Sequence, residues 1–284
     1  MPAPSRPWAV VVPVKGGSSA KSRLADPARP ALATAFALDT IMAALATVGV
    51  ERVVVVTSDP VVATVVRALD PGDRVVDLVP DPGVGLDAAA RAGVDRARAE
   101  HFHRVAVLLG DHPSLTSAEL EIALAAAATH RGAFVPDAAG TGTAMVALAA
   151  ADADPTTNFG GGSAARHAAQ GLARLDLDLP GLRLDVDEVT DLEAALAVGV
   201  GQHTARALRA TLTIVQATIH STGDEGGQAL LDDGSLIDWD LASVAGSGLR
   251  HLRVGQRVSV ELDDEDRRAR RMWIVGIGAG QVIS

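Results

Sequence analysis

The stretch Val10-Val11-Val12-Pro13-Val14-Lys15-Gly16-Gly17-Ser18-Ser19-Ala20-Lys21-Ser22-Arg23-Leu24 decides how the rest of the chain is read. Its first residues are apolar and β-branched, which is typical of a short buried strand. The strand runs into a glycine- and serine-rich loop that carries three cations, Lys15, Lys21 and Arg23. The two glycines tolerate the backbone angles of a concave nest of N–H groups, which binds anions. The stretch therefore predicts a strand followed by a phosphate site.

The distribution of lysine supports this interpretation. The chain has 25 lysines and arginines, and lysine occurs only at Lys15 and Lys21. An ammonium is a compact point charge that fits between phosphate oxygens, whereas a guanidinium is planar and directional. The alternative is a solvated loop with two chance lysines, and the coincidence of glycines and cations after a strand favours phosphate. The pattern Gly-x-x-x-x-Gly-Lys-Ser/Thr is absent, so this is not a Walker loop.

Composition limits the classes of protein to consider. With 284 residues, 48% of them hydrophobic and 2% aromatic, the chain can form one large or two ordinary domains with aliphatic cores. A net charge of −10 argues against general affinity for nucleic acid. The absence of cysteine excludes disulfides, a thiolate nucleophile and cysteine-bound zinc. The first apolar run ends at Lys15, so we expect neither a signal peptide nor a membrane span, and a cytoplasmic protein.

Strand and helix patterns alternate over the first two thirds of the chain. Such alternation predicts an α/β domain with a doubly wound parallel sheet, in which ligands bind at the carboxyl ends of the strands. The expected strands are residues 8–14, 52–57, 75–79, 105–109, 133–136, an apolar segment after 143, and 182–187. The expected helices are 31–48, 61–69, 86–100, 116–129, a short one after 163, and 190–198.

The pattern changes near residues 200–209. Short alternating segments follow, at 211–219, 228–231, 236–239, 257–262 and 272–277, with a hairpin signal at Asp233-Gly234. This pattern predicts a small all-β module. We expect two domains, residues 1–208 and 209–284.

Three carboxylates follow or form strand ends. Asp111 comes after a buried strand, and Asp185 and Asp187 alternate on one expected strand, so that both point to the same face. Singly, Asp111 could cap a turn and the other two could lie on a solvated edge. As a set beside a basic loop, they favour Mg²⁺ that bridges phosphates.

Two further glycine-rich loops, Gly140–Thr143 and Gly160–Ser163, can present N–H groups and hydroxyls to a phosphate or carboxylate. Ser163 is expected at a helix N-terminus, where an anion is favoured. The alternative is a pair of ordinary turns. Arg166 and His167 lie one turn further, and His167 is expected to be a helix-surface residue.

These motifs, in their order along the chain, resemble the CofC/FbiD family, the 2-phospho-L-lactate or phosphoenolpyruvate guanylyltransferases of coenzyme F420 biosynthesis. The match covers about residues 8–199. It is carried by the segments Pro13–Lys15, Ala20–Leu24, Gly85–Ala89, Gly110–Pro113, Pro136–Asp137, Gly140–Thr143, Phe159–Ser163 and Leu184–Asp187.

The resemblance implies a nucleotidyltransferase fold of the glycosyltransferase-A type. It implies transfer of GMP from GTP to phosphoenolpyruvate or 2-phospho-L-lactate, which gives the guanylyl diphospho product and pyrophosphate. The implied site residues are as follows: catalytic cations Lys15, Lys21 and Arg23; GTP contacts Pro13, Gly16, Ser18, Gly85, Leu86 and Asp87; acid-substrate contacts Thr143, Gly160 and Ser163; Mg²⁺ on Asp111, Asp185 and Asp187. The implied partners are these small molecules and the next enzyme of the pathway, to which the product could pass.

Three positions depart from the family pattern. His112 stands where the family has leucine, Asp87 where it commonly has asparagine, and Gly161 where it has proline. Asp87 can still accept hydrogen bonds from guanine N1–H and N2–H₂. The loss of proline loosens the substrate loop and leaves the identity of the acid open among phosphoenolpyruvate, 2-phospholactate and 3-phosphoglycerate. The arginine-rich composition suggests a high-GC genome, for which the resemblance favours phosphoenolpyruvate.

The C-terminal module resembles a cold-shock, OB-type barrel, on Leu231–Gly234 and Leu252–Val258. Segments 218–220 and 228–230 lack the aromatic residues on which single-stranded nucleic acid stacks. From Arg209 onward, acidic residues outnumber basic ones. We therefore expect a structural or protein-contact module and no nucleic-acid partner.

Two alternatives remain open at this point. One is another nucleotidyltransferase, with a sugar-1-phosphate or molybdopterin acceptor, although the usual Gly-x-Gly-x-Arg after the first strand is absent. The other is a non-catalytic nucleotide sensor coupled to nucleic acid. The three carboxylates and the missing barrel aromatics favour the enzyme.

Overall fold

A computed structural model describes residues 6–15, 29–212, 214–245, 252–262 and 268–274 of the chain. The chain divides into two structural units, Met1–Ala205 and Arg206–Ser284. Helix α8 (Gln202–Leu212) runs across this division, and the boundary expected at 208/209 also falls within it. Among the described residues, no helix is long and apolar enough to cross a membrane.

The first unit is built on a seven-stranded sheet in the order β3-β2-β1-β4-β6-β5-β7. Its strands are β1 (Trp8–Pro13), β2 (Val50–Val56), β3 (Val75–Val79), β4 (Arg104–Leu108), β5 (Gly132–Pro136), β6 (Thr143–Leu148) and β7 (Ala173–Arg174). Strands β3, β2, β1 and β4 are parallel, whereas β6 is antiparallel to both β4 and β5. The parallel pairing that the sequence predicted therefore holds for these four strands, and the sheet as a whole is mixed because β5 and β6 follow each other without a crossover helix.

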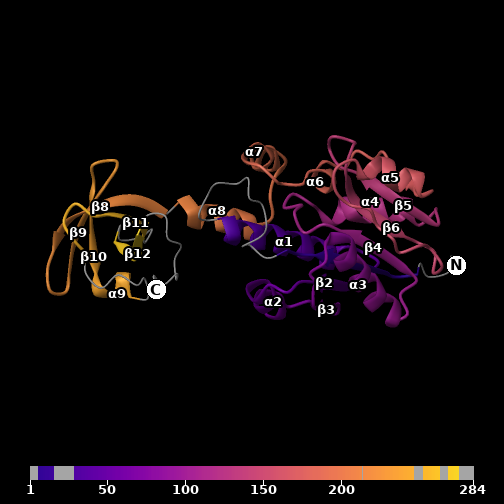
Figure 1. The fold of residues 1–284 in the computed structure, drawn as a ribbon, viewed down its shortest axis with the longest axis horizontal. Coiled ribbons are helices and arrows are strands. Elements are labelled where there is room, and N and C mark those ends of the chain that lie inside the picture. The colour runs from indigo at the N-terminus through magenta and orange to yellow at the C-terminus, as the bar shows by residue number, and fades with distance from the viewer. Residues whose placement is uncertain (1–5, 16–28, 213, 246–251, 263–267, 275–284) are drawn as a thin grey trace. The chain divides into compact units, whose positions relative to one another are not determined.

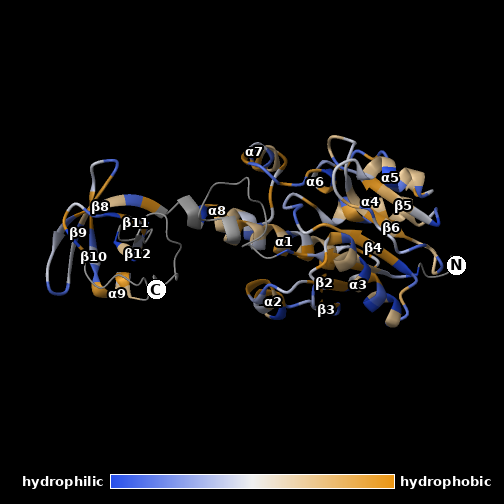
Figure 2. Cartoon of the chain, in the orientation of Figure 1, coloured by the Kyte–Doolittle hydropathy of each residue, from blue (hydrophilic) through white to orange (hydrophobic). Residues whose placement is uncertain are grey.

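Helices cover both faces of this sheet (Figure 1). They are α1 (Arg29–Ala46), α2 (Pro60–Arg67), α3 (Leu86–Ala99), α4 (Ser117–Ala127), α5 (Ser163–Ala169) and α6 (Pro180–Arg183), and a further helix, α7 (Val189–Val198), contacts α6. Helices α1, α2, α4 and α6 contribute to the core on one face, and α3 and α5 contribute to the core on the other. Figure 2 shows β2, β4 and β6 in the colour of hydrophobic residues, as expected for strands buried on both faces.

The central strand β1 shows how the sequence specifies these two layers. All six of its residues are buried. Trp8, Val10 and Val12 belong to the core under α1, α2, α4 and α6, whereas Ala9 and Val11 belong to the core under α3 and α5. A β-branched run of this kind can satisfy both layers at once, because successive side chains point to opposite faces.

The strand expected at residues 182–187 is wrong. Residues Pro180–Arg183 form the short helix α6, with proline at its start, and residues 184–187 have no regular structure. The alternating leucines imitate a strand, but Leu182 is buried as part of the helix. The segment that follows is fixed by a hydrogen bond from Val186 N–H to the carbonyl of Asp111, at 3.0 Å.

The second unit is an antiparallel five-stranded half-barrel, as the cold-shock resemblance implied. Its strands are β8 (Ile214–Thr222), β9 (Gly226–Leu231), β10 (Leu236–Asp240), β11 (Arg257–Leu262) and β12 (Ala269–Ile274), with a short helix α9 (Leu241–Val244). The order is β10-β9-β8-β11-β12, and the two edge strands β10 and β12 contact each other. The first strand begins at Ile214 and not at 211 as expected, because α8 continues to Leu212.

The aromatic side chains of the described half-barrel belong to its interior. Trp239 and Trp273 are each 6% exposed. Stacking of bases needs exposed aromatic faces. These two tryptophans therefore stabilise the module and do not offer a stacking platform.

Candidate active site

A pocket of about 530 Å³ opens in the first unit, at the carboxyl ends of β1 and β4. Nine of the expected site residues line it: Pro13, Lys15, Leu86, Asp111, Thr143, Gly160, Ser163, Asp185 and Asp187. Gly85 and Asp87 flank Leu86 and do not line it. The expected site residues Gly16, Ser18, Lys21 and Arg23 lie outside the described part of the chain.

Two neighbouring strand ends form the floor of this pocket. Strands β1 and β4 pair in parallel, so Val14-Lys15 and Gly110-Asp111 leave the sheet side by side. Their approach is close: a Cβ on Gly110 would lie 3.1 Å from Val14 Cγ2 and 3.3 Å from the carbonyl oxygen of Pro13. Glycine at position 110 thus allows the end of β1 and the segment that carries Asp111 to pass close to each other.

The three carboxylates come from two segments that the fold ties together. The hydrogen bond from Val186 to the Asp111 carbonyl sets Asp185 and Asp187 on either side of the link. Burial, and next the negative charge of Asp111, raises the pKa of Asp185 above its ordinary value. Like charges held this close favour a bound cation.

His112 provides further contacts between the segment after β4 and the segment that carries Asp185. Its side chain is fully buried, and Nδ1 lies 3.3 Å from the carbonyl oxygen of Leu184. Its backbone N–H and carbonyl both contact the hydroxyl of Thr40 in α1, at 3.3 and 3.2 Å. The histidine at this position therefore links the segment after β4 to the segment that carries Asp185.

The donor set fits a divalent cation that shares its ligands with phosphate. Within the described residues, no group of three His, Cys, Asp or Glu side chains is arranged to hold a metal by itself. Mg²⁺ usually takes one or two carboxylates and fills its other positions with phosphate oxygens and waters. Asp111 and Asp185, close enough for one charge to raise the pKa of the other, meet this requirement.

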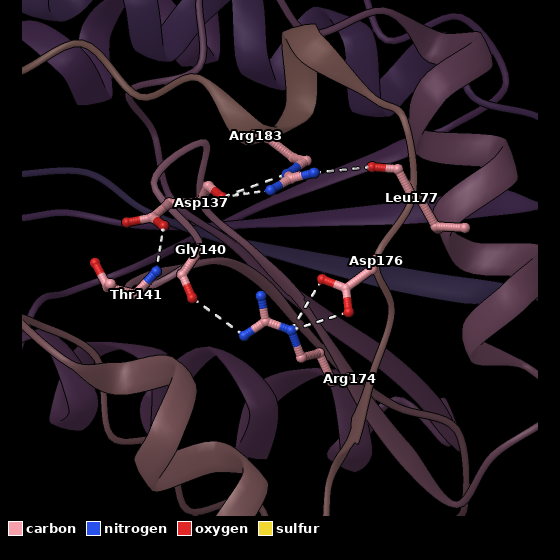
Figure 3. A network of polar contacts seen from close by, with 7 residues as sticks. All are labelled: Asp137, Gly140, Thr141, Arg174, Asp176, Leu177 and Arg183. Carbon is pink, nitrogen blue, oxygen red and sulfur yellow. Dashed lines mark hydrogen bonds and ion pairs between the residues drawn. The ribbon is translucent and has the colours of Figure 1, made fainter.

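The loop between β5 and β6 forms one wall of the pocket, and Figure 3 shows how it is held. The carboxylate of Asp137 accepts hydrogen bonds from the N–H groups of Thr141 and Gly142, at 3.0 and 2.9 Å. Arg183 donates to the carbonyl of Asp137 at 3.0 Å, and Arg174 donates to that of Gly140 at 3.1 Å. Because its amides are already bonded internally, this loop serves as a rigid support for Thr143.

The glycine-rich loop before α5 also lines the pocket, next to the β5–β6 loop, and Arg166 holds its backbone in place. The guanidinium donates to the carbonyls of Asn158, Phe159, Gly160 and Gly161, at distances between 2.7 and 3.3 Å. The sequence predicted a looser loop here, because Gly161 replaces a proline. Arg166 supplies the fixation instead, by holding four consecutive carbonyls.

A network of hydroxyls and imidazole joins these two walls. Ser163 Oγ donates to Thr143 Oγ1 at 3.0 Å, and His167 Nδ1 lies 2.9 Å from the same oxygen. Thr143 is 6%, Ser163 1% and His167 0% exposed. The expectation that His167 is a helix-surface residue is therefore wrong. The spacing Ser163-x-x-x-His167 was the available signal, since residues four apart share one helix face.

Asp87 connects the start of α3 to the glycine-rich loop. Its Oδ1 accepts hydrogen bonds from Thr157 Oγ1 at 2.8 Å and from the N–H of Phe159 at 3.0 Å. Leu86, next to it, lines the pocket. The expected contact of Asp87 with guanine stays a prediction, and the structure gives this carboxylate a second task in loop position.

Known proteins that are similar to this chain indicate its family. The MobA-like NTP transferase domain family matches residues 31–232. A phosphoenolpyruvate guanylyltransferase from Streptomyces scabiei is 48% identical over 208 residues, which cover 70% of this chain and 95% of that protein. One from Geodermatophilus obscurus is 46% identical over 213 residues, 72% of this chain and 94% of that protein.

Among solved structures, one from Desulfovibrio desulfuricans G20, assigned to the nucleotide-diphospho-sugar transferases, has a TM-score of 0.54 at 17% identity. It covers 71% of this chain and 94% of its own, and it supports the nucleotidyltransferase fold. The sequence identity of these matches and the share of the chain that they cover establish the family. The chain belongs to the MobA-like NTP transferases and, among them, to the phosphoenolpyruvate guanylyltransferase family.

Proposed function

We propose that the protein transfers the guanylyl group of GTP to the phosphate of phosphoenolpyruvate in coenzyme F420 biosynthesis, yielding enolpyruvyl-2-diphospho-5'-guanosine and pyrophosphate. One observation carries this assignment: a single pocket is lined both by Lys15 with three carboxylates and by the hydroxyl-bearing residues Thr143 and Ser163. The first set suits a nucleoside triphosphate with its cation. The second suits a small phosphorylated acid.

The reaction needs no strong general base, because the acceptor phosphate is mostly ionised at neutral pH. One of its oxygens attacks the α-phosphorus of GTP, and a new P–O bond forms. The bond from this phosphorus to the bridging oxygen of the β-phosphate breaks, and its electrons leave with pyrophosphate. The protein therefore acts mainly by alignment and by stabilising charge.

Different residues of the pocket are assigned to charge stabilisation and to alignment. Lys15 supplies positive charge at the phosphates, and Thr143, Gly160 and Ser163 hold the acid in line with the α-phosphorus. Asp111 and Asp185, with Asp187 beside them, would hold Mg²⁺, which would neutralise charge on the phosphates as the leaving group departs. Lys21 and Arg23 are proposed to complete the triphosphate site.

The assignment is tested by pyrophosphate release from the purified protein with GTP and each of phosphoenolpyruvate, 2-phospholactate and 3-phosphoglycerate. We expect the highest kcat/KM with phosphoenolpyruvate, and no release without a divalent cation. Faster turnover with 2-phospholactate would change the substrate and keep the reaction. Absence of turnover with all three acids would contradict the proposed function.

We also propose that residues 1–208 carry the activity and that residues 209–284 have a structural or protein-contact role, such as transfer of the product to the next pathway enzyme. All residues that line the pocket precede Glu188, which supports this division. A chain ended after α8 should keep most of its kcat/KM. A truncated protein that folds, by its circular dichroism, and yet is inactive would refute the division.

A further inference from the structure

His167 occupies a fully buried position between the walls of the pocket. Its ring contacts Phe134 and Phe159, with centroid distances of 5.7 and 5.5 Å, and the Phe159 contact is edge-on. These two contacts fix the plane of the imidazole. Packing against these rings therefore restricts rotation of the imidazole and sets the direction in which each ring nitrogen points.

The partners of the two nitrogens decide which one carries the proton. The backbone N–H of Asn158 donates to His167 Nε2 at 3.0 Å. A backbone N–H can only donate, so Nε2 must present its lone pair. In the neutral ring the proton then sits on Nδ1, and Nδ1–H donates to Thr143 Oγ1 at 2.9 Å.

This polarity determines what the neighbouring hydroxyls can do. Thr143 Oγ1 accepts from His167, and it also contacts Ser163 Oγ at 3.0 Å. The two hydroxyls hold two hydrogens, and one of them is used in the bond between them. Whichever way that bond runs, one hydroxyl hydrogen is left to donate, and both residues line the pocket.

We propose that His167 is a positioning residue that makes the Thr143–Ser163 pair a hydrogen-bond donor toward an anionic oxygen of the acid substrate. The inference rests on the proposed function for the identity of that substrate. A neutral Nδ1–H imidazole is required throughout, because a second proton on Nε2 would face the N–H of Asn158. The histidine acts through Thr143 and does not itself touch the reacting atoms.

The surroundings favour this neutral state. Burial lowers the pKa of His167, and the charge of Arg166 lowers it further, while Asp87 opposes the shift. The two aromatic rings that contact the imidazole, Phe134 and Phe159, add no charge. At neutral pH the imidazole can therefore keep one tautomer without a competing protonated form.

Two substitutions separate the functions of the two nitrogens. In His167→Asn the side-chain amide nitrogen can replace Nδ1–H as the donor to Thr143. In His167→Gln the longer side chain can place its oxygen near the Asn158 N–H, but the donor to Thr143 is lost. His130→Gln, at an exposed site away from the pocket, is the matched control.

We expect His167→Gln to raise KM for phosphoenolpyruvate by about tenfold or more, the scale of one hydrogen bond to a charged group. KM for GTP should stay within about twofold, and His167→Asn should restore much of the loss. An equal rise in both KM values, or no difference between the Asn and Gln variants, would overturn the positioning role. A variant that only loosened the fold would not show this selectivity.

Imidazole ¹⁵N NMR of the full chain tests the tautomer without turnover. The signal that disappears in His167→Asn should show a protonated Nδ1 and an unprotonated Nε2, unchanged between pH 8 and pH 6.5. A protonated Nε2 would overturn the inference even if the variants showed the expected rise in KM for phosphoenolpyruvate. Lack of turnover by the parent would refute the proposed function, and the tautomer measurement would still decide for or against the His167 arrangement.

Discussion

The backbone N–H of Val186 donates a hydrogen bond to the carbonyl of Asp111 at 3.0 Å, and this bond joins two segments far apart in the chain. It places Asp185 and Asp187 next to Asp111, in the segment that follows β4. Without it the carboxylates would belong to separate loops. The expected metal site therefore depends on a tertiary contact between a strand end and an irregular segment.

This relationship leads to a first prediction, for the carboxylates. Asp111→Asn and Asp185→Asn should each lower kcat/KM by about two orders of magnitude or more, because each removes a charge that holds the cation against the triphosphate. Asp187→Asn should have the same direction of effect. Turnover is measured as pyrophosphate release over a Mg²⁺ titration, with thermal unfolding as the check on folding. Near-normal turnover in all three variants would refute the metal assignment.

The lysines give a second prediction. Lys15→Arg and Lys21→Arg should each weaken the use of GTP by about tenfold to a hundredfold, the scale of a charge-assisted hydrogen bond of about 1.5–3 kcal/mol. A guanidinium keeps the charge but cannot take the position of an ammonium among converging oxygens. The measurement is kcat/KM with GTP varied. If the double variant matched the parent, the loop would be an ordinary solvated surface.

A third prediction concerns the clamp on the glycine-rich loop. Arg166→Lys keeps the charge but can hold fewer of the four carbonyls, so KM for phosphoenolpyruvate should rise several-fold with little change in KM for GTP. Arg131→Lys, in an exposed ion pair with Asp152, is the control and should be neutral. Identical kinetics for Arg166→Lys and the control would show that the loop is held by its own backbone.

Asp87 allows a fourth prediction, because its two suggested tasks differ in their requirements. Loop position needs an acceptor oxygen, which Asp87→Asn retains for Thr157 and Phe159. If the carboxylate instead recognises guanine N2–H₂, kcat/KM should be higher with GTP than with ITP, which lacks this amino group. Asp87→Asn would then reduce that preference for GTP. The ratio of kcat/KM for GTP and ITP, in parent and variant, decides between them. We expect the ratio to fall less than about threefold, since Oδ1 is already engaged in the loop, and a larger fall would assign Asp87 to guanine.

The fifth prediction is a pH effect on stability. Burial lowers the pKa of His167, so the unfolded chain binds this proton more readily than the folded one. The stability that this neutral histidine contributes is present above about pH 6.5, the ordinary pKa of histidine, and is lost as the pH falls toward the lowered value. The melting temperature of the parent should fall more between pH 7 and pH 5.5 than that of His167→Asn. Parallel curves for the two proteins would contradict a buried neutral imidazole.

Much of the fold follows from local pattern in the sequence. The β-branched runs at Val10–Val12 and Val53–Val56 predict buried strands, and the structure places both in strands that are buried and paired on both sides. Thr116, where the helix expected at 116–129 begins, forms a capping box with Glu119. These features are set by residues close in sequence, so hydrophobic period and cap chemistry are enough to predict them.

The sequence by itself also determined which residue types would meet at the strand ends, since glycines, cations and carboxylates follow the buried strands. Only the tertiary structure decided that β6 runs antiparallel, that residues 184–187 are irregular, and that His167 is buried against Thr143. The physical reason is the same in each case. Strand direction, the tie between Val186 and Asp111, and the proton position on an imidazole all depend on partners distant in the chain, and no local periodicity carries that information.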